Sequence, residues 1–445
     1  MKFFILSILL LAGLSLSAQR KRDFVRTVHF SIAPALGSNG FHPGGYTNYF
    51  SLHVTSGYAA ASYLLEIAGI SNLNVNETRG LQIAGLTNIT GANAFAGMSA
   101  KEVDKLVREG FEPNLSGIQV SGITNVVLNN VFGTQFTGGV NVAGGALQGL
   151  QISGVGNMVA KYTFGIQLGG VFNMSVASMD GLQLSSLYNM TKNELFGVQL
   201  SAFNVAGVIH GKNSYENNDP TGVQIGLINR SRVMNGFQIG MINIGKTVQG
   251  TQIGLINFYS GGKTPQTRDG TSIGLVNIGS TGYFAVYTSE LFTANVEVAT
   301  GTNKNRRMSG ENTTREIVNA LIYGKNPGGG NEWMIGYGLR KKYLNRSSAP
   351  GFGHIRFLMF GVDALHYNHS SSLTRELSLI ARPNVSAGSR FHPKNRNFFF
   401  FATLAYNVYF TDTGRGVRTL FIDTSDEEGD GLLHWPGFSA GVLVR

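Results

Sequence analysis

The sequence predicts an all-β protein: a β-solenoid-like stack of 14–16-residue repeats with flanking antiparallel strands. Three observations favour this fold class. Glycine supplies 60 of the 445 residues, and aromatic residues nearly match charged ones, at 11% against 13%. A short unit recurs through the middle of the chain, and longer strand-like runs follow it. The flanking strands also fit an outer-membrane β-barrel. The competing architecture is one large up-and-down barrel that includes the repeats.

The first 18 residues have the pattern of a signal peptide. Lys2 precedes an apolar run from Phe3 to Leu16, and small residues follow at Ser17 and Ala18. This order of a positive, an apolar and a small-residue segment predicts cleavage near Ala18. The chain contains no Cys, which is typical of export in a Gram-negative bacterium rather than of a disulfide-stabilised secreted protein.

The repeat unit consists of Gly, aliphatic, Gln, aliphatic, small, Gly, aliphatic, any residue and Asn, and we place it at 64–277. Successive units lie 16 residues apart from Gly117 to Gly197, and a shorter form repeats every 14 residues from Gly222 to Gly250. Strict periods of this kind indicate a repeat architecture. Two degenerate copies flank the set, one with Glu66 and one with Ser272 at the Gln position.

Three features favour a solenoid over barrel strands for these units. The units are direct repeats, whereas neighbouring strands of an up-and-down barrel run in opposite directions. The longer insertions, 89–116, 205–221 and 258–269, all follow the Asn, as expected if they leave from one corner of successive coils. The Gln-to-Asn offset is six residues in the long unit and five in the short one. In one continuous strand this difference would turn the Asn to the other face, so a corner or bulge is expected at the Gly between the two side chains.

The repeated amides are expected to form structural ladders, because stacked coils bring identical side chains about 4.8 Å apart. The alternative is an amide surface that binds sugars. The expected ladder residues are Gln82, Gln119, Gln135, Gln151, Gln167, Gln183, Gln199, Gln224, Gln238, Gln252, Asn88, Asn125, Asn141, Asn157, Asn173, Asn189, Asn204, Asn229, Asn243 and Asn257.

One insertion carries a helix signal. Ser99 and Glu102 form a capping box, apolar residues follow on one helical face, and Gly110 ends the pattern. We therefore expect a short helical insertion near 99–110, within the repeat region.

The regions on either side of the repeats predict longer strands. Residues 19–63 are expected to form N-terminal strands. In 278–445, strand-like runs begin at 291, 316, 333, 354, 376, 398 and 437, and several reach the ten residues that a tilted membrane strand needs. This part is expected to be an antiparallel, barrel-like β region. The alternative is a soluble antiparallel sheet packed against the solenoid.

The units of the GxQIGLxN type, the export signal and the strand-rich C-terminal part together resemble bacterial surface-repeat proteins of Bacteroidetes and spirochaetes. The resemblance covers most of the mature chain and is best over 64–277. It implies an outer-membrane or cell-surface location, and it implies no enzyme activity.

No catalytic, cofactor-binding or metal-binding residue is predicted. His366 and His369 lie near Asp363, but two residues at this spacing in one strand point to opposite faces. The acidic stretch 423–430 has the composition of a solvated loop. The net charge of +10 is scattered along the chain, so no nucleic-acid partner is expected.

The sequence therefore predicts a non-enzymatic structural or interaction protein of the outer membrane or cell surface of a Gram-negative bacterium. The expected partner is the outer membrane or a surface glycan. Two alternatives are a channel-forming outer-membrane β-barrel and a carbohydrate-binding surface adhesin.

Overall fold

The computed structural model describes residues 24–92, 113–209, 222–259, 270–279, 281–304, 313–327, 330–345, 355–373, 376–391, 397–412, 416–417, 419 and 432–445. The expected signal peptide, the helical insertion near 99–110 and the acidic stretch 423–430 lie outside these residues. The chain divides into two compact units, Met1–Arg230 and Ser231–Arg445.

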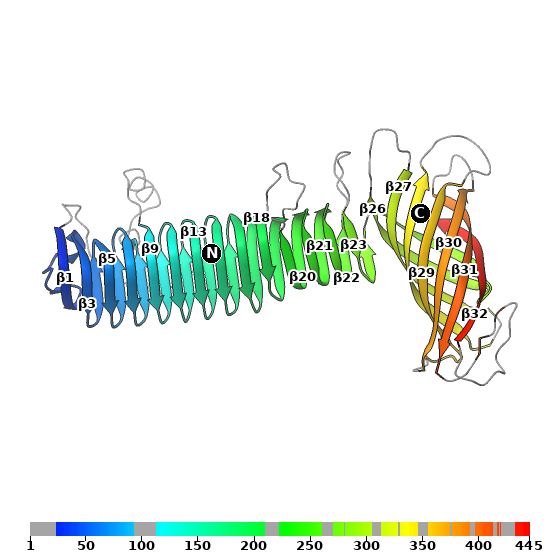
Figure 1. Ribbon diagram of the computed structural model, residues 1–445, viewed down its shortest axis with the longest axis horizontal. Helices are drawn as coiled ribbons and strands as arrows, with labels where there is room; N and C mark the ends of the chain where they lie inside the picture. Colours follow the sequence, from blue (N-terminus) through cyan, green and yellow to red (C-terminus); the bar gives the residue numbers. More distant parts are fainter. Residues whose placement is uncertain are drawn as a thin grey trace. The chain divides into compact units, whose positions relative to one another are not determined.

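The fold is all-β, as predicted, with a solenoid-like parallel stack of about 12 turns and a closed eight-stranded antiparallel barrel (Figure 1). The repeats form the stack, so they are not strands of one large barrel. The stack strands are β1 (Phe24–Ala33), β2 (Leu36–Gly37), β3 (Tyr46–His53), β4 (Ser56–Ala59), β5 (Ala61–Ala68), β6 (Ser71–Asn74), β7 (Thr78–Ala84), β8 (Thr87–Thr90), β9 (Leu115–Ser121), β10 (Thr124–Val127), β11 (Val131–Thr137), β12 (Val140–Ala143), β13 (Leu147–Ser153), β14 (Gly156–Val159), β15 (Thr163–Gly169), β16 (Phe172–Ser175), β17 (Ser178–Ser185), β18 (Tyr188–Leu200), β19 (Phe203–Ile209), β20 (Val223–Met234), β21 (Phe237–Val248), β22 (Thr251–Tyr259), β23 (Thr271–Ile273) and β24 (Val276–Ile278). A 3-10 turn, η2 (Pro43–Gly45), precedes β3.

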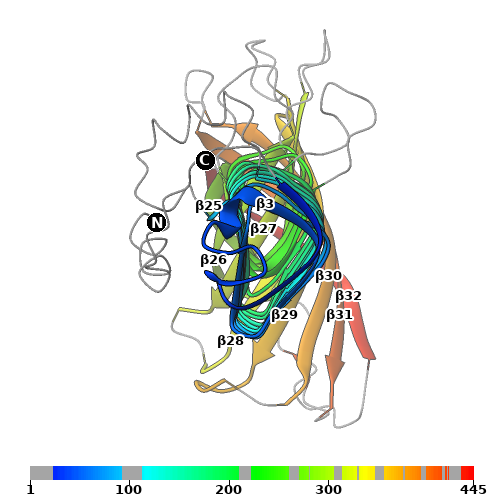
Figure 2. The ribbon, with the colours of Figure 1, turned by 90° about the vertical axis from the view of Figure 1, so that its left-hand side faces the viewer.

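Each central coil consists of one longer and one shorter strand, such as β9 and β10. The longer strands pair in parallel with Gln119 opposite Gln135, and the shorter ones pair with Asn125 opposite Asn141. Viewed along the stack, the coils of the first unit superimpose as one flattened loop (Figure 2). One coil therefore equals one 16-residue repeat, and every unit residue lies beside its own counterpart.

The first Gly of the unit is required by close approach of the coils. Gly149 has φ of +140°, and a Cβ there would overlap the carbonyl oxygen of Gly133 in the preceding coil. Only a residue without a side chain adopts this conformation at this distance from the neighbouring backbone. The positive φ recurs at the first Gly of each unit from Gly80 to Gly197.

The stack begins before the first recognisable unit. β1 pairs with β3, and β3 pairs with β5, all in parallel and with coil-like register. Residues 24–53 are therefore coils of the stack. The repeat pattern does not reveal them because His29, Ser31, Ser51 and His53 take interior positions in place of the amides.

The barrel strands are β25 (Thr281–Ser289), β26 (Ala294–Lys304), β27 (Thr313–Lys325), β28 (Trp333–Asn345), β29 (Phe357–Asn368), β30 (Ser378–Arg390), β31 (Phe398–Thr411) and β32 (Leu432–Val444). Neighbours pair antiparallel in chain order, and pairing of β25 with β32 closes the barrel. Seven of these strands match runs found in the sequence. The sequence analysis missed β25, which is the shortest and follows the last repeat directly.

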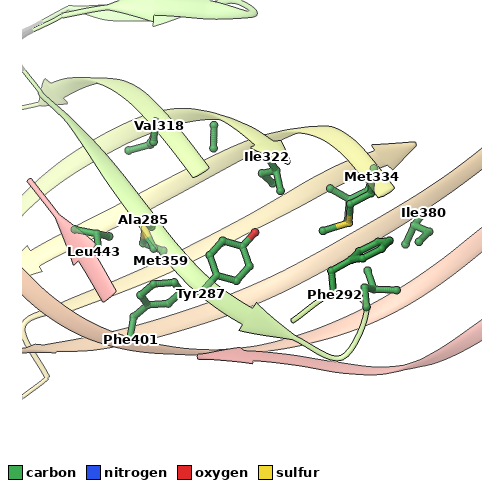
Figure 3. Packing of buried hydrophobic residues seen from close by; sticks show 14 of the residues in the cluster. Ala285, Tyr287, Phe292, Val318, Ile322, Met334, Met359, Ile380, Phe401 and Leu443 are labelled. Atoms are coloured by element: carbon green, nitrogen blue, oxygen red, sulfur yellow. The ribbon is translucent and has the colours of Figure 1, made fainter. Parts of the chain in front are cut away.

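Aromatic and aliphatic side chains fill part of the barrel interior (Figure 3). The rings of Tyr287 and Phe401 meet edge to face with their centroids 5.8 Å apart, and Phe292 lies 5.4 Å from Tyr367. Eight strands enclose a space just wide enough for side chains to fill.

Candidate functional site

The glutamines of the stack form a hydrogen-bonded ladder in its interior. Gln167 donates from Nε2 to Oε1 of Gln151 at 2.9 Å, and its own Oε1 accepts from Gln183 at 2.7 Å. All the glutamines and asparagines named from the sequence have 0% exposed surface. The same Gln-to-Gln bond runs from 119 to 82, 135 to 119, 151 to 135, 199 to 183, 224 to 199 and 252 to 238.

All the Gln-to-Gln bonds point the same way, and the residues beyond the first and the last glutamine supply the groups that this direction requires. In each of these Gln-to-Gln bonds the donor Nε2 belongs to the residue nearer the C-terminus, so every N–H points toward the N-terminus and every oxygen toward the C-terminus. In the first unit, Gln82 donates to the Glu66 carboxylate at 2.8 Å, and in the second unit, Ser272 donates to Oε1 of Gln252 at 2.9 Å. The two degenerate repeat copies thus supply an acceptor-only group and a hydroxyl donor where the ladder needs them.

The asparagines form a second ladder that runs the opposite way. Asn141 donates to Oδ1 of Asn157 at 2.9 Å and to the backbone oxygen of Ile152 at 2.8 Å, so its N–H points toward the C-terminus. The ladder also includes Asn72 and Asn277, which the sequence analysis did not assign to it. The dipoles of aligned amides sum along a stack as they do in a helix. Because the Gln and Asn ladders run in opposite directions, their summed dipoles oppose each other.

A buried cluster of titratable groups lies at the start of the Gln ladder. His53 Nε2 is 3.4 Å from Oε1 of Glu66, and His53 Nδ1 is 2.6 Å from Oγ of Ser31. His29 Nδ1 is 2.7 Å from Oγ of Ser38. Burial, and secondarily the neighbouring His53, lowers the pKa of His29 to about 4, although Glu66 opposes the shift.

This cluster has the residue types of a nucleophile, a base and an orienting carboxylate. Its geometry does not fit that chemistry, because Ser31 is fully buried and offers no approach for a substrate. Among the residues described, no three His, Cys, Asp or Glu side chains are placed to hold a metal ion. The arrangement can instead terminate the polar interior of the stack.

The barrel interior contains a second polar network. The Arg340 guanidinium contacts Glu297 at 2.5 Å and Asp363 at 3.0 Å, and Asn384 donates to Asp363 at 2.9 Å. Arg382, two residues before Asn384, pairs with Glu290 at 3.2 Å. These groups are almost completely buried, and each charge has an opposite partner.

The residues around His366 do not form a joint site. Asp363 faces the barrel interior and binds Arg340. His369 Nε2 lies 3.3 Å from the Tyr409 hydroxyl, and the backbone oxygen of Ser370 accepts from the Trp333 indole. The Asp363 and His369 side chains therefore contact different groups.

The outward-facing side chains of the barrel are mainly apolar. In β29, Phe360 and Val362 are exposed, whereas the alternate residues Met359 and Asp363 are buried. β31 has the same alternation, with Leu404 75% exposed. Each of these strands therefore has an apolar outer face, whereas its inner face mixes apolar and polar side chains.

Comparisons with protein-family models, curated proteins and solved structures found no match to this chain. Within the described ranges, none of the elements is a helix of the length and apolarity needed to cross a membrane.

The ladder predicts an unequal response to loss of its members. Gln167→Leu removes one donor and one acceptor in the middle, so two buried amides lose a partner, at about 1–3 kcal/mol for each unsatisfied group. Ser272→Ala removes one donor at the end and should cost less. Thermal unfolding followed by circular dichroism compares both variants with the parent. Equal, near-zero effects would contradict a stabilising ladder.

The lowered pKa of His29 predicts weaker folding in mild acid. The unfolded chain binds this proton near pH 6.5, whereas the folded chain binds it only near pH 4. Stability therefore falls as the pH drops from 6.5 toward 4. We expect the unfolding midpoint in urea to fall more between pH 7 and pH 5 for the parent than for His29→Asn. An identical pH dependence of the two proteins would show that His29 is not the responsible group.

Proposed function

We propose that this is an exported outer-membrane protein of a Gram-negative bacterium that acts as a structural or interaction protein without catalysis. The barrel would anchor the chain in the bilayer, and the stack would be the module that the anchor carries. The apolar outer face of the barrel, bounded by aromatic and cationic side chains, is the observation that carries this proposal.

Two aromatic groups lie toward opposite ends of the barrel strands. The rings of Tyr323 and Trp333 are 6.0 Å apart at one end. At the other end, Tyr343 contacts Phe360, and the Lys341 amine lies 5.4 Å from the centre of the Tyr343 ring.

The spacing of these groups matches a membrane. Trp333 and Tyr343 are ten residues apart in β28, or about 33 Å along a strand. At the tilt of membrane barrel strands, this corresponds to about 25 Å along the barrel axis, the height of the apolar band in such barrels.

The filled interior supports an anchor over a channel. An eight-stranded barrel has little free internal width. Here its interior contains the Arg340, Glu297 and Asp363 network as well as the packed aromatic rings. We therefore expect no stepwise conductance when the purified protein is added to a planar bilayer.

Cell fractionation tests the proposed location. The mature protein should sediment with outer membranes and resist washing with high salt, because its attachment is apolar rather than ionic. A soluble periplasmic protein serves as the control for leakage. Recovery of the chain in the soluble periplasm would contradict the proposal.

A pair of arginine substitutions tests which surface meets lipid. Val362 lies near the middle of the outer face, and Val362→Arg should destabilise the protein in vesicles by about 2–4 kcal/mol. Leu432→Arg introduces the same side chain at a strand end, where the cost should be about 0–1 kcal/mol. Denaturant unfolding of both variants in vesicles gives the comparison. Two small and equal effects are the outcome expected of a barrel in water.

A further inference from the structure

The stack has its amides inside and its aliphatic side chains outside. In β9, Gln119 is buried and its neighbour Ile118 is 42% exposed; in β17, Gln183 is buried and Leu184 is 39% exposed. This is the reverse of a solenoid in water, where the aliphatic residues of each coil form the core. The exposure of these aliphatic side chains therefore needs an explanation.

The exposed aliphatic side chains include a row along one corner of the first unit, which we call the apolar edge. This corner follows the longer strand of each coil, and its residues are each 39–55% exposed. Gly139 and Ala202 occupy the same corner in two further coils. The apolar edge consists of Ile70, Leu86, Ile123, Val155, Val171, Leu187 and Leu227.

The other corner follows the shorter strand, and it carries charged side chains in some of the coils; we call it the polar edge. In the first unit it carries Lys161, Lys192 and Glu194, and both lysines are exposed. In contrast, no charged residue occurs between the Gly and the Asn of any unit from Gly80 to Asn277. The charged side chains of these coils thus lie outside the Gly-to-Asn segment that contains the apolar edge.

The backbone of the stack is suited to an apolar environment. Each interior coil pairs in parallel with the coil before and the coil after it, so its strand N–H and C=O groups have partners within the chain. Lipid excludes structures that leave these groups unpaired. The ladder amides are also hydrogen-bonded to one another inside the stack, as Gln135 is to Gln119 and to Gln151.

The shape of the apolar surface favours lipid over a protein partner. The aliphatic side chains cover the corner and also the faces on both sides of it, as with Ile152 on one face and Met158 on the other. A soluble chain rarely exposes a contiguous apolar patch of more than a few hundred square ångströms. A second copy packed ridge to ridge on this convex corner would bury little of the ~800 Å² per partner that a stable interface needs. Acyl chains, in contrast, can surround a ridge on all sides.

We propose that the stack lies edge-on in lipid, with the apolar edge among acyl chains and the polar edge in water. This gives the chain a second lipid-contacting surface in addition to the barrel. The inference rests on the proposed membrane location, and it concerns only the stack.

The absence of Cys from the chain permits a direct test. Single substitutions Val155→Cys and Leu187→Cys place a bimane fluorophore on the apolar edge. Lys161→Cys and Lys192→Cys place it on the polar edge, and Val362→Cys reports on the barrel. Each full-length protein is reconstituted in vesicles of phosphatidylcholine and phosphatidylglycerol with and without a nitroxide on the acyl chain. Iodide is the water-soluble quencher.

The nitroxide lipid should remove most of the emission from the two apolar-edge labels and from the barrel label. The polar-edge labels should keep their emission with nitroxide lipid and lose it with iodide. Circular dichroism of each labelled protein must match the parent. Ile123→Cys and Val171→Cys replace any apolar-edge variant that fails this criterion.

The other outcomes separate the two proposals. If only the barrel label responds to nitroxide lipid and iodide quenches the apolar edge, the inference is overturned and the proposed function stands. Protection of the apolar edge from both quenchers, with disulfide cross-links between unlabelled Val155→Cys chains, would assign it to a second copy. A barrel label that does not respond to nitroxide lipid would overturn the membrane location itself.

Discussion

The in-register stacking of identical amides is the interaction on which the solenoid depends. Parallel pairing places each coil about 4.8 Å from the next, and at that distance a Gln side chain reaches its own counterparts in the coils before and after it. Gln135, for example, donates to Gln119 at 2.9 Å and accepts from Gln151 at 2.8 Å. A shift of one residue would turn the amides outward and the aliphatic side chains inward. The ladders therefore specify the register, and the glycines permit the close approach.

The interior of such a coil has room for one layer of side chains. Amides and hydroxyls occupy much of it, with small apolar clusters such as Leu115, Val131 and Leu147 near one corner. Since neighbouring residues of a strand face opposite ways, the aliphatic residues on either side of each Gln must face outward. An apolar exterior is thus the direct consequence of a polar interior, and the proposed lipid environment follows from the ladder.

The repeat period, the direct orientation of the units and the position of the insertions were sufficient to predict the solenoid. The same pattern could not tell which face is inside, because strict alternation identifies residues that share a face without assigning that face to the core. The ladder ends were hidden because Glu66 and Ser272 appear as imperfect repeats, although each supplies the group that the ladder end requires. The first coils escaped notice because histidine and serine replace the amides there. The ion pairs of Arg340 and Arg382 join residues far apart in sequence, which no local pattern reveals.

The stack and the barrel share two features: bonded polar groups are buried in their interiors, and many apolar side chains face outward. In water this choice is costly, because burying an ion pair such as Arg340 and Asp363 gains little over packing apolar side chains of similar size. In lipid the comparison changes, because acyl chains are as apolar as leucine and nothing drives aliphatic side chains together. Hydrogen bonds and ion pairs then become the interactions that distinguish a specific fold from an unspecific one. In the proposed lipid environment, these bonded polar groups would hold the interior of each unit together, and in the barrel they do so beside a packed apolar cluster.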